Sequence, residues 1–216
     1  MENGLIENRL RRPNLIQGGT VYSIIVLLFL FIGSRVQKTE LYSGVVITEY
    51  IIILLPPLAL LVFYRFDVKK VLRLNKTGFL TILVVFLIMV FILPLVGIVN
   101  LANLLIVRSI FGKIMLAQIP AAQNGVELLR GLFVIGVSAG ICEEVLFRGF
   151  LMRCFERFGQ VKAILATSFL FALLHVDFQK LFGTFFLGAV IGFIVYRSDS
   201  LLNGMFAHFT NNAIVV

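Results

Sequence analysis

The sequence predicts an all-α fold, a polytopic membrane helical bundle with about seven to eight transmembrane helices. Of the 216 residues, 60% are hydrophobic and only 14% are charged, and the mean hydropathy is +1.03. Soluble domains carry about 25% charged residues, so this composition is typical of a membrane protein. A membrane-crossing helix needs about 20 apolar residues, and most of the chain fits that template. We therefore expect a single membrane domain over residues 1–216.

Seven apolar segments are expected to form the spans. The first follows a polar, arginine-containing stretch, and because no small-residue cleavage site comes after it, we interpret it as a transmembrane helix and not as a signal peptide. Pro56, Pro57 and Pro94 lie in the second and third segments and are expected to kink them. The predicted spans are residues 18–34, 42–64, 78–99, 127–156, 160–177, 180–197 and 200–216.

A further apolar stretch, residues 101–118, lies between the third and fourth segments. It is interrupted by Arg108 and Lys113. One more short span would account for it, but an interfacial or re-entrant helix agrees better with the two charges.

The charge pattern predicts the topology. The formal net charge is +8, and most basic side chains lie in short connections beside apolar segments, where Lys and Arg orient membrane proteins. The alternation of basic and less basic connections places the N-terminus, the loop 65–76 and the turn near Gly159 in the cytoplasm. The expected partner of these basic residues is the lipid bilayer, and no nucleic acid partner is expected.

Two adjacent carboxylates and an arginine interrupt the fourth segment. An ionisable side chain at membrane depth costs at least about 2.5 kcal/mol by insertion scales, so it marks a candidate functional site. Glu144 and Arg148 are four residues apart on a helix and are expected to form an ion pair. Glu143 points about 100° away from Glu144 and is left without this partner.

The two histidines of the chain, His175 and His208, also lie in apolar segments. If the helices around Gly159 form an antiparallel hairpin, Glu143 lies sixteen residues before the turn and His175 sixteen residues after it. Both would then lie about 24 Å from the turn, at the same depth. His208 and Asn212 are four residues apart and share one helix face.

These residue types together indicate amide hydrolysis. A buried carboxylate beside an imidazole can hold and deprotonate water, which assigns Glu143 and His175 to water activation. His208 and Asn212 would supply hydrogen-bond donors to the developing oxyanion. No serine or cysteine nucleophile is required.

The cofactor is left open by the pattern. Glu143, His175 and His208 could provide three ligands to a divalent metal such as zinc, with water in the fourth position. The sequence contains no HExxH motif, and direct action of a glutamate without any required cofactor explains the same residues.

Three short motifs, in this order on apolar segments, resemble those of the CAAX prenyl endopeptidase and bacteriocin-processing (CPBP, or Abi) family of intramembrane proteases, often labelled metalloproteases. The resemblance covers residues 125–216, so we treat this part as the catalytic core and residues 18–118 as a scaffold. It implies the same roles for the two histidines, the asparagine and the first glutamate. The motifs are Glu143-Glu144-x-x-x-Arg148, Phe171-x-x-x-His175 and His208-x-x-x-Asn212.

The expected function is therefore an intramembrane endopeptidase that cuts membrane-associated peptides or proteins, for example at a C-terminal or a leader peptide. The expected location is the cell membrane, as a multi-pass protein of a bacterial inner membrane. Two alternatives belong to other classes: a non-hydrolytic scaffold or bacteriocin self-immunity protein, and a transporter that uses the buried charges as a relay.

Two expectations concern the edges of the pattern. Glu49, in the second segment, is expected to make a polar contact within the bundle or to lie near the outer interface. Members of the family commonly continue into a further helix after the third motif, whereas this sequence ends at Val216, so we expect either a shortened sequence or a cavity whose last wall is open.

Overall fold

The computed structural model describes residues 11–114 and 122–215, and every regular element within them is a helix. The all-α prediction is confirmed. Five helices are long and apolar enough to cross a membrane, as judged by length and composition. Two further helices, α11 and α13, have 15 residues each. The five long helices are Leu15–Thr39, Leu41–Phe63, Phe79–Phe111, Gly125–Phe158 and Leu181–Ser198.

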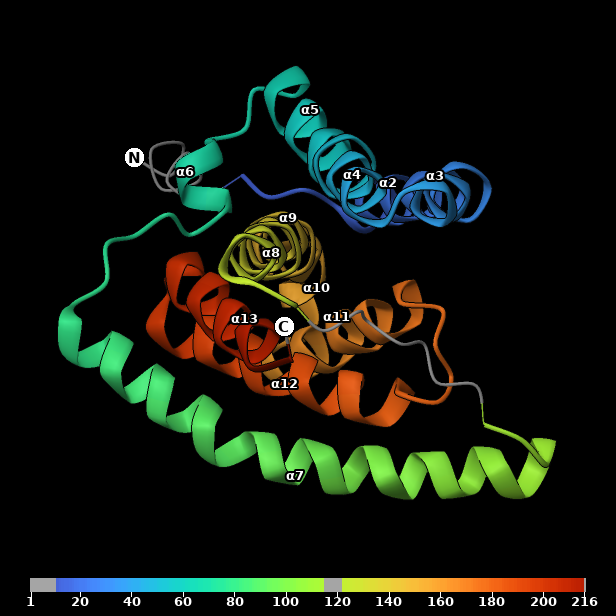
Figure 1. The fold of residues 1–216 in the computed structure, drawn as a ribbon. Helices are drawn as coiled ribbons and strands as arrows, with labels where there is room; N and C mark the ends of the chain where they lie inside the picture. The colour runs from blue at the N-terminus through green and yellow to red at the C-terminus, as the bar shows by residue number, and fades with distance from the viewer. Residues whose placement is uncertain (1–10, 115–121, 216) are drawn as a thin grey trace, which may run out of the picture.

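The helices form layers around the central helix that runs from α8 to α10 (Figure 1). The N-terminal hairpin, α2 to α5, covers one side of it, and α11, α12 and α13 cover the other, with α7 packed outside α12 and α13. The α-helices are α2 (Leu15–Leu28), α3 (Ser34–Thr39), α4 (Leu41–Ile47), α5 (Leu55–Phe63), α6 (Val68–Val71), α7 (Phe79–Phe111), α8 (Gly125–Gly131), α9 (Ala139–Glu144), α10 (Met152–Phe155), α11 (Gln160–Leu174), α12 (Leu181–Ser198) and α13 (Leu201–Val215).

Several of the long helices contain π-helical stretches, which widen a helix locally and are frequent at functional sites. Each stretch lies between two α-helical parts, so the long helix continues through it without a break. These stretches are η1 (Phe29–Gly33), η2 (Thr48–Leu54), η3 (Leu132–Ser138) and η4 (Val145–Leu151), and the 3-10 turn η5 (Glu156–Phe158) ends the central helix.

The N-terminal hairpin turns at Glu40, which caps α4. Its backbone is extended (φ −148°, ψ 120°), and its carboxylate accepts a 2.6 Å hydrogen bond from the Ser43 amide. Hydrogen bonds from Ser43 lower the pKa of Glu40 below its usual value, with a smaller contribution from Arg130. The helices approach closely beside the turn, because a Cβ built at Gly44 would lie 2.5 Å from the Gln37 Cα. The turn therefore fixes the register of the hairpin.

The stretch 101–118 does not form a separate helix as far as the structure describes it. The helix α7 continues from Phe79 to Phe111, through Pro94, and ends where Gly112 adopts a left-handed conformation (φ 72°). Arg108 lies in the last turn, where a cation interacts favourably with the helix dipole. The prediction of an interfacial or re-entrant helix is therefore wrong for residues 101–111, and residues 115–118 lie outside the described part.

A buried polar cluster joins the loop 65–76 to the end of the central helix. Arg73 forms ion pairs with Glu156 and with Asp199, the latter at 2.7 Å. Arg153 donates a 2.7 Å hydrogen bond to the Lys70 carbonyl oxygen. These contacts place the loop and the turn after η5 at the same end of the bundle, and the assignment of this end to the cytoplasm stays a prediction.

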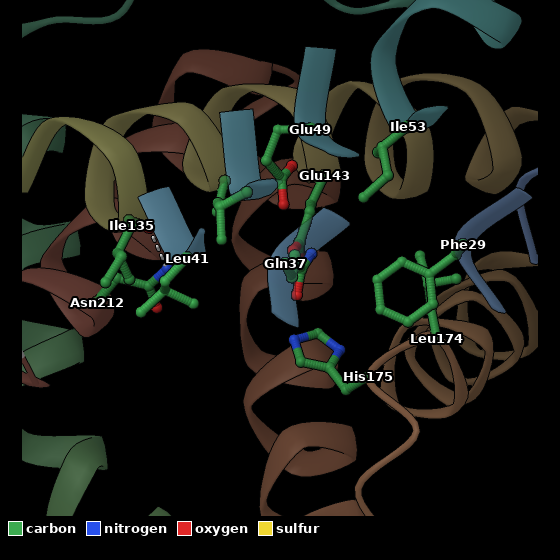
Figure 2. Close-up of a pocket in the computed structure, with 12 residues that line it drawn as sticks. Phe29, Gln37, Leu41, Glu49, Ile53, Ile135, Glu143, Leu174, His175 and Asn212 are labelled. Atoms are coloured by element: carbon green, nitrogen blue, oxygen red, sulfur yellow. Dashed lines mark hydrogen bonds between the residues drawn. The ribbon is translucent and has the colours of Figure 1, made fainter. Parts of the chain in front are cut away.

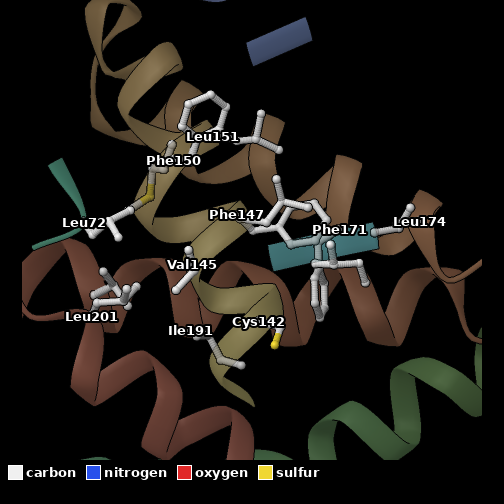
Figure 3. Close-up of a cluster of buried hydrophobic side chains, with 14 of the residues drawn as sticks. Leu72, Cys142, Val145, Phe147, Phe150, Leu151, Phe171, Leu174, Ile191 and Leu201 are labelled. Carbon is white, nitrogen blue, oxygen red and sulfur yellow. The ribbon is translucent and has the colours of Figure 1, made fainter. Parts of the chain in front are cut away.

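Glycines allow the central helix to pack closely against its neighbours. A Cβ at Gly140 would lie 3.3 Å from the Met205 carbonyl oxygen and 3.4 Å from the Phe209 amide nitrogen, both on α13. Small residues permit such backbone contact where the lipid offers no hydrophobic drive for helix association. Figure 3 shows the apolar side chains, among them Phe147, that fill the remaining space around this helix.

The close approach at Gly140 predicts that Gly140→Val destabilises the protein by about 1–3 kcal/mol, because added methyl groups overpack a tight contact. Gly97→Val is the matched control, since a Cβ there meets nothing within 4 Å. Thermal unfolding in detergent can be followed with a thiol-reactive dye, because the free thiols of Cys142 and Cys154 are buried. Equal unfolding temperatures for both variants would contradict the tight contact.

Candidate active site

Three of the predicted site residues, Glu143, His175 and Asn212, line a cavity of about 300 Å³ between the N-terminal hairpin and the central helix (Figure 2). The other three, Glu144, Arg148 and His208, are buried next to it and are not part of its lining. Glu143 on α9 is 8% exposed and reaches this cavity, as do His175 at the end of α11 and Asn212 on α13. The depth argument from Gly159 is thus consistent with the structure, in which Glu143 and His175 line one cavity. The lining residues are Phe29, Gln37, Leu41, Val45, Glu49, Ile53, Ile135, Ala139, Glu143, Leu174, His175 and Asn212.

The expected ion pair between Glu144 and Arg148 is confirmed. Arg148 Nη1 donates a 2.7 Å hydrogen bond to Glu144 Oε1, and both side chains are 0% exposed. Arg148 Nη2 donates to the Gly188 carbonyl oxygen at 2.9 Å. A Cβ at Gly188 would lie 3.3 Å from this nitrogen, so the glycine leaves the space that the guanidinium needs. The pair therefore joins the central helix to α12.

Glu144 also holds His208. His208 Nδ1 lies 2.9 Å from Glu144 Oε1, and Nε2 of the same ring lies 3.9 Å from Glu143 Oε2. A carboxylate only accepts hydrogen bonds, so Nδ1 carries a proton and donates it. Nε2 can then donate to an oxyanion only when the ring is doubly protonated.

His175 has the opposite arrangement of its ring nitrogens. Its Nδ1 lies 2.9 Å from the Phe171 carbonyl oxygen, which can only accept, so Nδ1 carries the proton. In the neutral ring Nε2 is then a hydrogen-bond acceptor. The ring also packs edge-on against Phe171, with ring centroids 4.7 Å apart, as the i to i+4 spacing predicts. His175 is thereby oriented to accept a hydrogen bond from water.

Asn212 is held by hydrogen bonds on both sides of its amide. Its Nδ2 donates to the Ile135 carbonyl oxygen at 2.9 Å, and its Oδ1 accepts from Asn211 Nδ2 at 2.8 Å. An amide nitrogen carries two hydrogens, so one donor of Asn212 is left for a bound molecule.

The sequence did not predict that the N-terminal hairpin would contribute polar groups to the site. Gln37 and Glu49 line the same cavity as Glu143. Gln37 Nε2 donates a 3.0 Å hydrogen bond to Thr48 Oγ1, which holds the Gln37 side chain against the second helix of the hairpin. For Glu49 a signal was present, because a lone carboxyl group in an apolar span is costly unless it has a role.

The metal-ligand set considered from the sequence is not assembled. In the described ranges 11–114 and 122–215, no group of three or more His, Cys, Asp or Glu side chains is arranged to hold a metal ion. Glu143, His175 and His208 therefore do not fit a zinc site in this conformation, and no step is derived through a metal.

Comparison with protein families agrees with the resemblance seen in the motifs. Residues 125–214 match the model of the Rce1-like family, described as type II CAAX prenyl endopeptidase Rce1-like. This is a protease family, and the matched range contains all three motifs. No curated protein and no solved structure matches the chain. Residues 125–214 are thus similar to a protease family, and the long apolar helices are typical of a multi-pass membrane protein.

The buried pair predicts that Arg148→Leu destabilises the protein by about 3–5 kcal/mol, because the buried Glu144 carboxylate loses its ion-pair partner and keeps only the contact with His208. Arg108→Leu, at an exposed arginine of α7, should have little effect on the unfolding temperature. The double variant Glu144→Leu/Arg148→Leu should recover much of the loss, since it removes both charges. A double variant no more stable than Arg148→Leu alone would contradict this account.

Proposed function

We propose that this chain, whose residues 125–214 match the Rce1-like family, is an intramembrane endopeptidase that hydrolyses peptide bonds of membrane-associated peptides or proteins. The observation that carries the proposal is the common cavity of Glu143, His175 and Asn212, with His208 3.9 Å from Glu143. Carboxylate, imidazole and amide groups around one apolar cavity are the parts that water-dependent amide cleavage requires.

In the proposed reaction a water molecule binds between the Glu143 carboxylate and Nε2 of His175. Glu143 takes one proton, and the oxygen attacks the carbonyl carbon of the scissile bond. The carbonyl oxygen becomes an oxyanion, which accepts a hydrogen bond from Asn212 Nδ2 and, when the His208 ring is doubly protonated, from His208 Nε2. When the C–N bond breaks, Glu143 returns the proton to the leaving amine.

Glu144 and Arg148 support this reaction without touching the substrate. Glu144 Oε1 lies 2.9 Å from His208 Nδ1, so it fixes the orientation of the imidazole ring beside Glu143. Arg148, 2.7 Å away, prevents Glu144 from being an unpaired buried carboxylate. This arrangement supports a positioning role for both.

The shape of the cavity favours an extended substrate that enters along the N-terminal hairpin. On the second helix of the hairpin, the lining residues run from Ile53 to Leu41, next to the turn at Glu40. These positions are twelve residues apart, so this wall of the cavity is about 18 Å long at 1.5 Å per residue. The Glu40 turn lies at the opposite end of the hairpin from the start at Leu15. With the N-terminus in the cytoplasm of a cell-membrane protein, this end faces the outer surface.

We expect Glu143→Gln to lower kcat by about 10²- to 10⁴-fold, because the general base is removed while the side-chain volume is kept. The assay uses the purified full chain and an internally quenched peptide with a farnesylated CAAX terminus, in parallel with the unprenylated peptide. Glu127→Gln, at the start of the same long helix, is the control and should keep the wild-type rate. Wild-type activity in Glu143→Gln would exclude Glu143 as the base.

Removal of divalent metals should leave the rate of peptide cleavage unchanged, since the proposed reaction uses Glu143 directly. The measurement compares the wild-type protein before and after dialysis against a chelator. Loss of activity that returns on addition of zinc would show a metal-dependent reaction and contradict the direct role of the glutamate.

A further inference from the structure

The second carboxyl group of the cavity, Glu49, has no role in the reaction proposed above. It lies on η2 in the N-terminal hairpin and is 5% exposed. It lines the same cavity as Glu143, and Figure 2 shows its side chain beside that of Glu143. Helix α9, which carries Glu143, packs directly against η2. The two carboxyl groups therefore come from different halves of the chain and meet at the cavity.

The side chains of Glu49 and Glu143 lie next to each other in the cavity (Figure 2), and each has a buried oxygen atom facing this apolar space. Carboxylate oxygens only accept, so a hydrogen bond between them requires that one group carries a proton. Within the described residues, neither Glu49 Oε2 nor Glu143 Oε2 receives a hydrogen bond from another donor, although both atoms are buried. Two carboxylates this close in an apolar environment cannot both be ionised, which favours one shared proton.

The neighbouring cationic and polar groups indicate which carboxyl group holds the proton. Glu143 lies 3.9 Å from His208 Nε2 and interacts electrostatically with Arg148, so positive charge surrounds it. Glu49 has no ion pair within the described ranges, and its closest ionisable neighbours are Glu143 and the buried thiol of Cys142. Glu143 thus has an imidazole nitrogen 3.9 Å away, whereas Glu49 has no basic side chain as an ion-pair partner among the described residues.

The polar side chains next to Glu49 on its own helix are engaged elsewhere. Thr48 Oγ1 donates to the Gly44 carbonyl oxygen at 2.8 Å, and the Tyr50 hydroxyl lies 3.3 Å from Ser138 Oγ. Neither of these side chains is hydrogen-bonded to Glu49, which leaves its carboxyl group facing the cavity and Glu143.

We propose that Glu49 is a positioning residue that carries a proton and donates a hydrogen bond to the Glu143 carboxylate. This contact holds the base ionised and directed into the cavity, so the scaffold half of the chain takes part in catalysis. The inference rests on the proposed peptidase function for its kinetic consequence. The carboxyl pair itself can be tested without any substrate.

Infrared difference spectra of the full chain at neutral pH test the pair directly. The wild-type minus Glu49→Gln spectrum should contain the C=O band of a protonated carboxylic acid. The wild-type minus Glu143→Gln spectrum should contain carboxylate bands. Glu40→Gln, at an exposed carboxyl group of the same hairpin, is the control and should remove only carboxylate bands. Carboxylate bands from Glu49 would overturn the proposal, as would an acid band from Glu143.

Kinetics with the quenched farnesylated peptide then test the positioning role. Glu49→Gln should keep a kcat close to that of the wild type, because an amide N–H also donates to Glu143. Glu49→Met should lower kcat by roughly 10- to 100-fold, the value of a hydrogen bond to a charged group, with an unchanged KM. A loss of the same size in both variants, or a change in KM alone, would contradict positioning through this hydrogen bond.

The two experiments separate failure of the inference from failure of the proposed function. If the wild-type protein cleaves neither peptide, the peptidase proposal fails for these substrates, and the infrared assignments still decide whether Glu49 and Glu143 share a proton. If Glu49→Met unfolds in the thermal assay, Glu49→Gln and its spectrum remain as the deciding measurements.

Discussion

The structure depends on one buried carboxylate oxygen, Oε1 of Glu144, which interacts with Arg148 and with His208 at the same time. Each contact joins the central helix to another helix. Arg148 also donates a hydrogen bond to the Gly188 carbonyl oxygen on α12, and His208 belongs to α13. In a medium of low dielectric constant a lone ion is unstable, so these partners must remain together. The most strongly buried charges therefore also determine how three helices are arranged.

The adjacent residue has a different environment although it lies on the same turn. Glu143 points about 100° away from Glu144, toward the cavity and the N-terminal hairpin. It has no ion pair closer than the 3.9 Å contact with His208 among the described residues. Arg148 pairs with Glu144, so Glu143 is the carboxyl group of this turn that faces the cavity. The glutamate pair thus combines a structural carboxylate with a chemically available one.

Helical periodicity was sufficient to predict the features that lie within one or two consecutive helices. The i to i+4 pair of Glu144 and Arg148 and the packing of Phe171 on His175 follow from spacing alone. Glu49 could be recognised as a lone carboxyl group in an apolar span, but its position beside Glu143 could not be predicted, because it depends on how the hairpin packs against the central helix. The length of α7 was also not predicted. Arg108 was interpreted as an interruption of the apolar segment, but an arginine is equally compatible with the last turn of a helix.

Two parts of the chain form the walls of the cavity, and only one of them lies in the range that matches the protein family. The match to the Rce1-like family covers residues 125–214, which carry the three motifs, and it includes none of the hairpin residues from Phe29 to Ile53 that form the opposite wall. Two relatives could therefore keep the same chemistry while presenting unlike surfaces to a bound peptide. Substrate preference in such proteins can diverge by change in the hairpin alone, without any change in the motifs by which the family is identified.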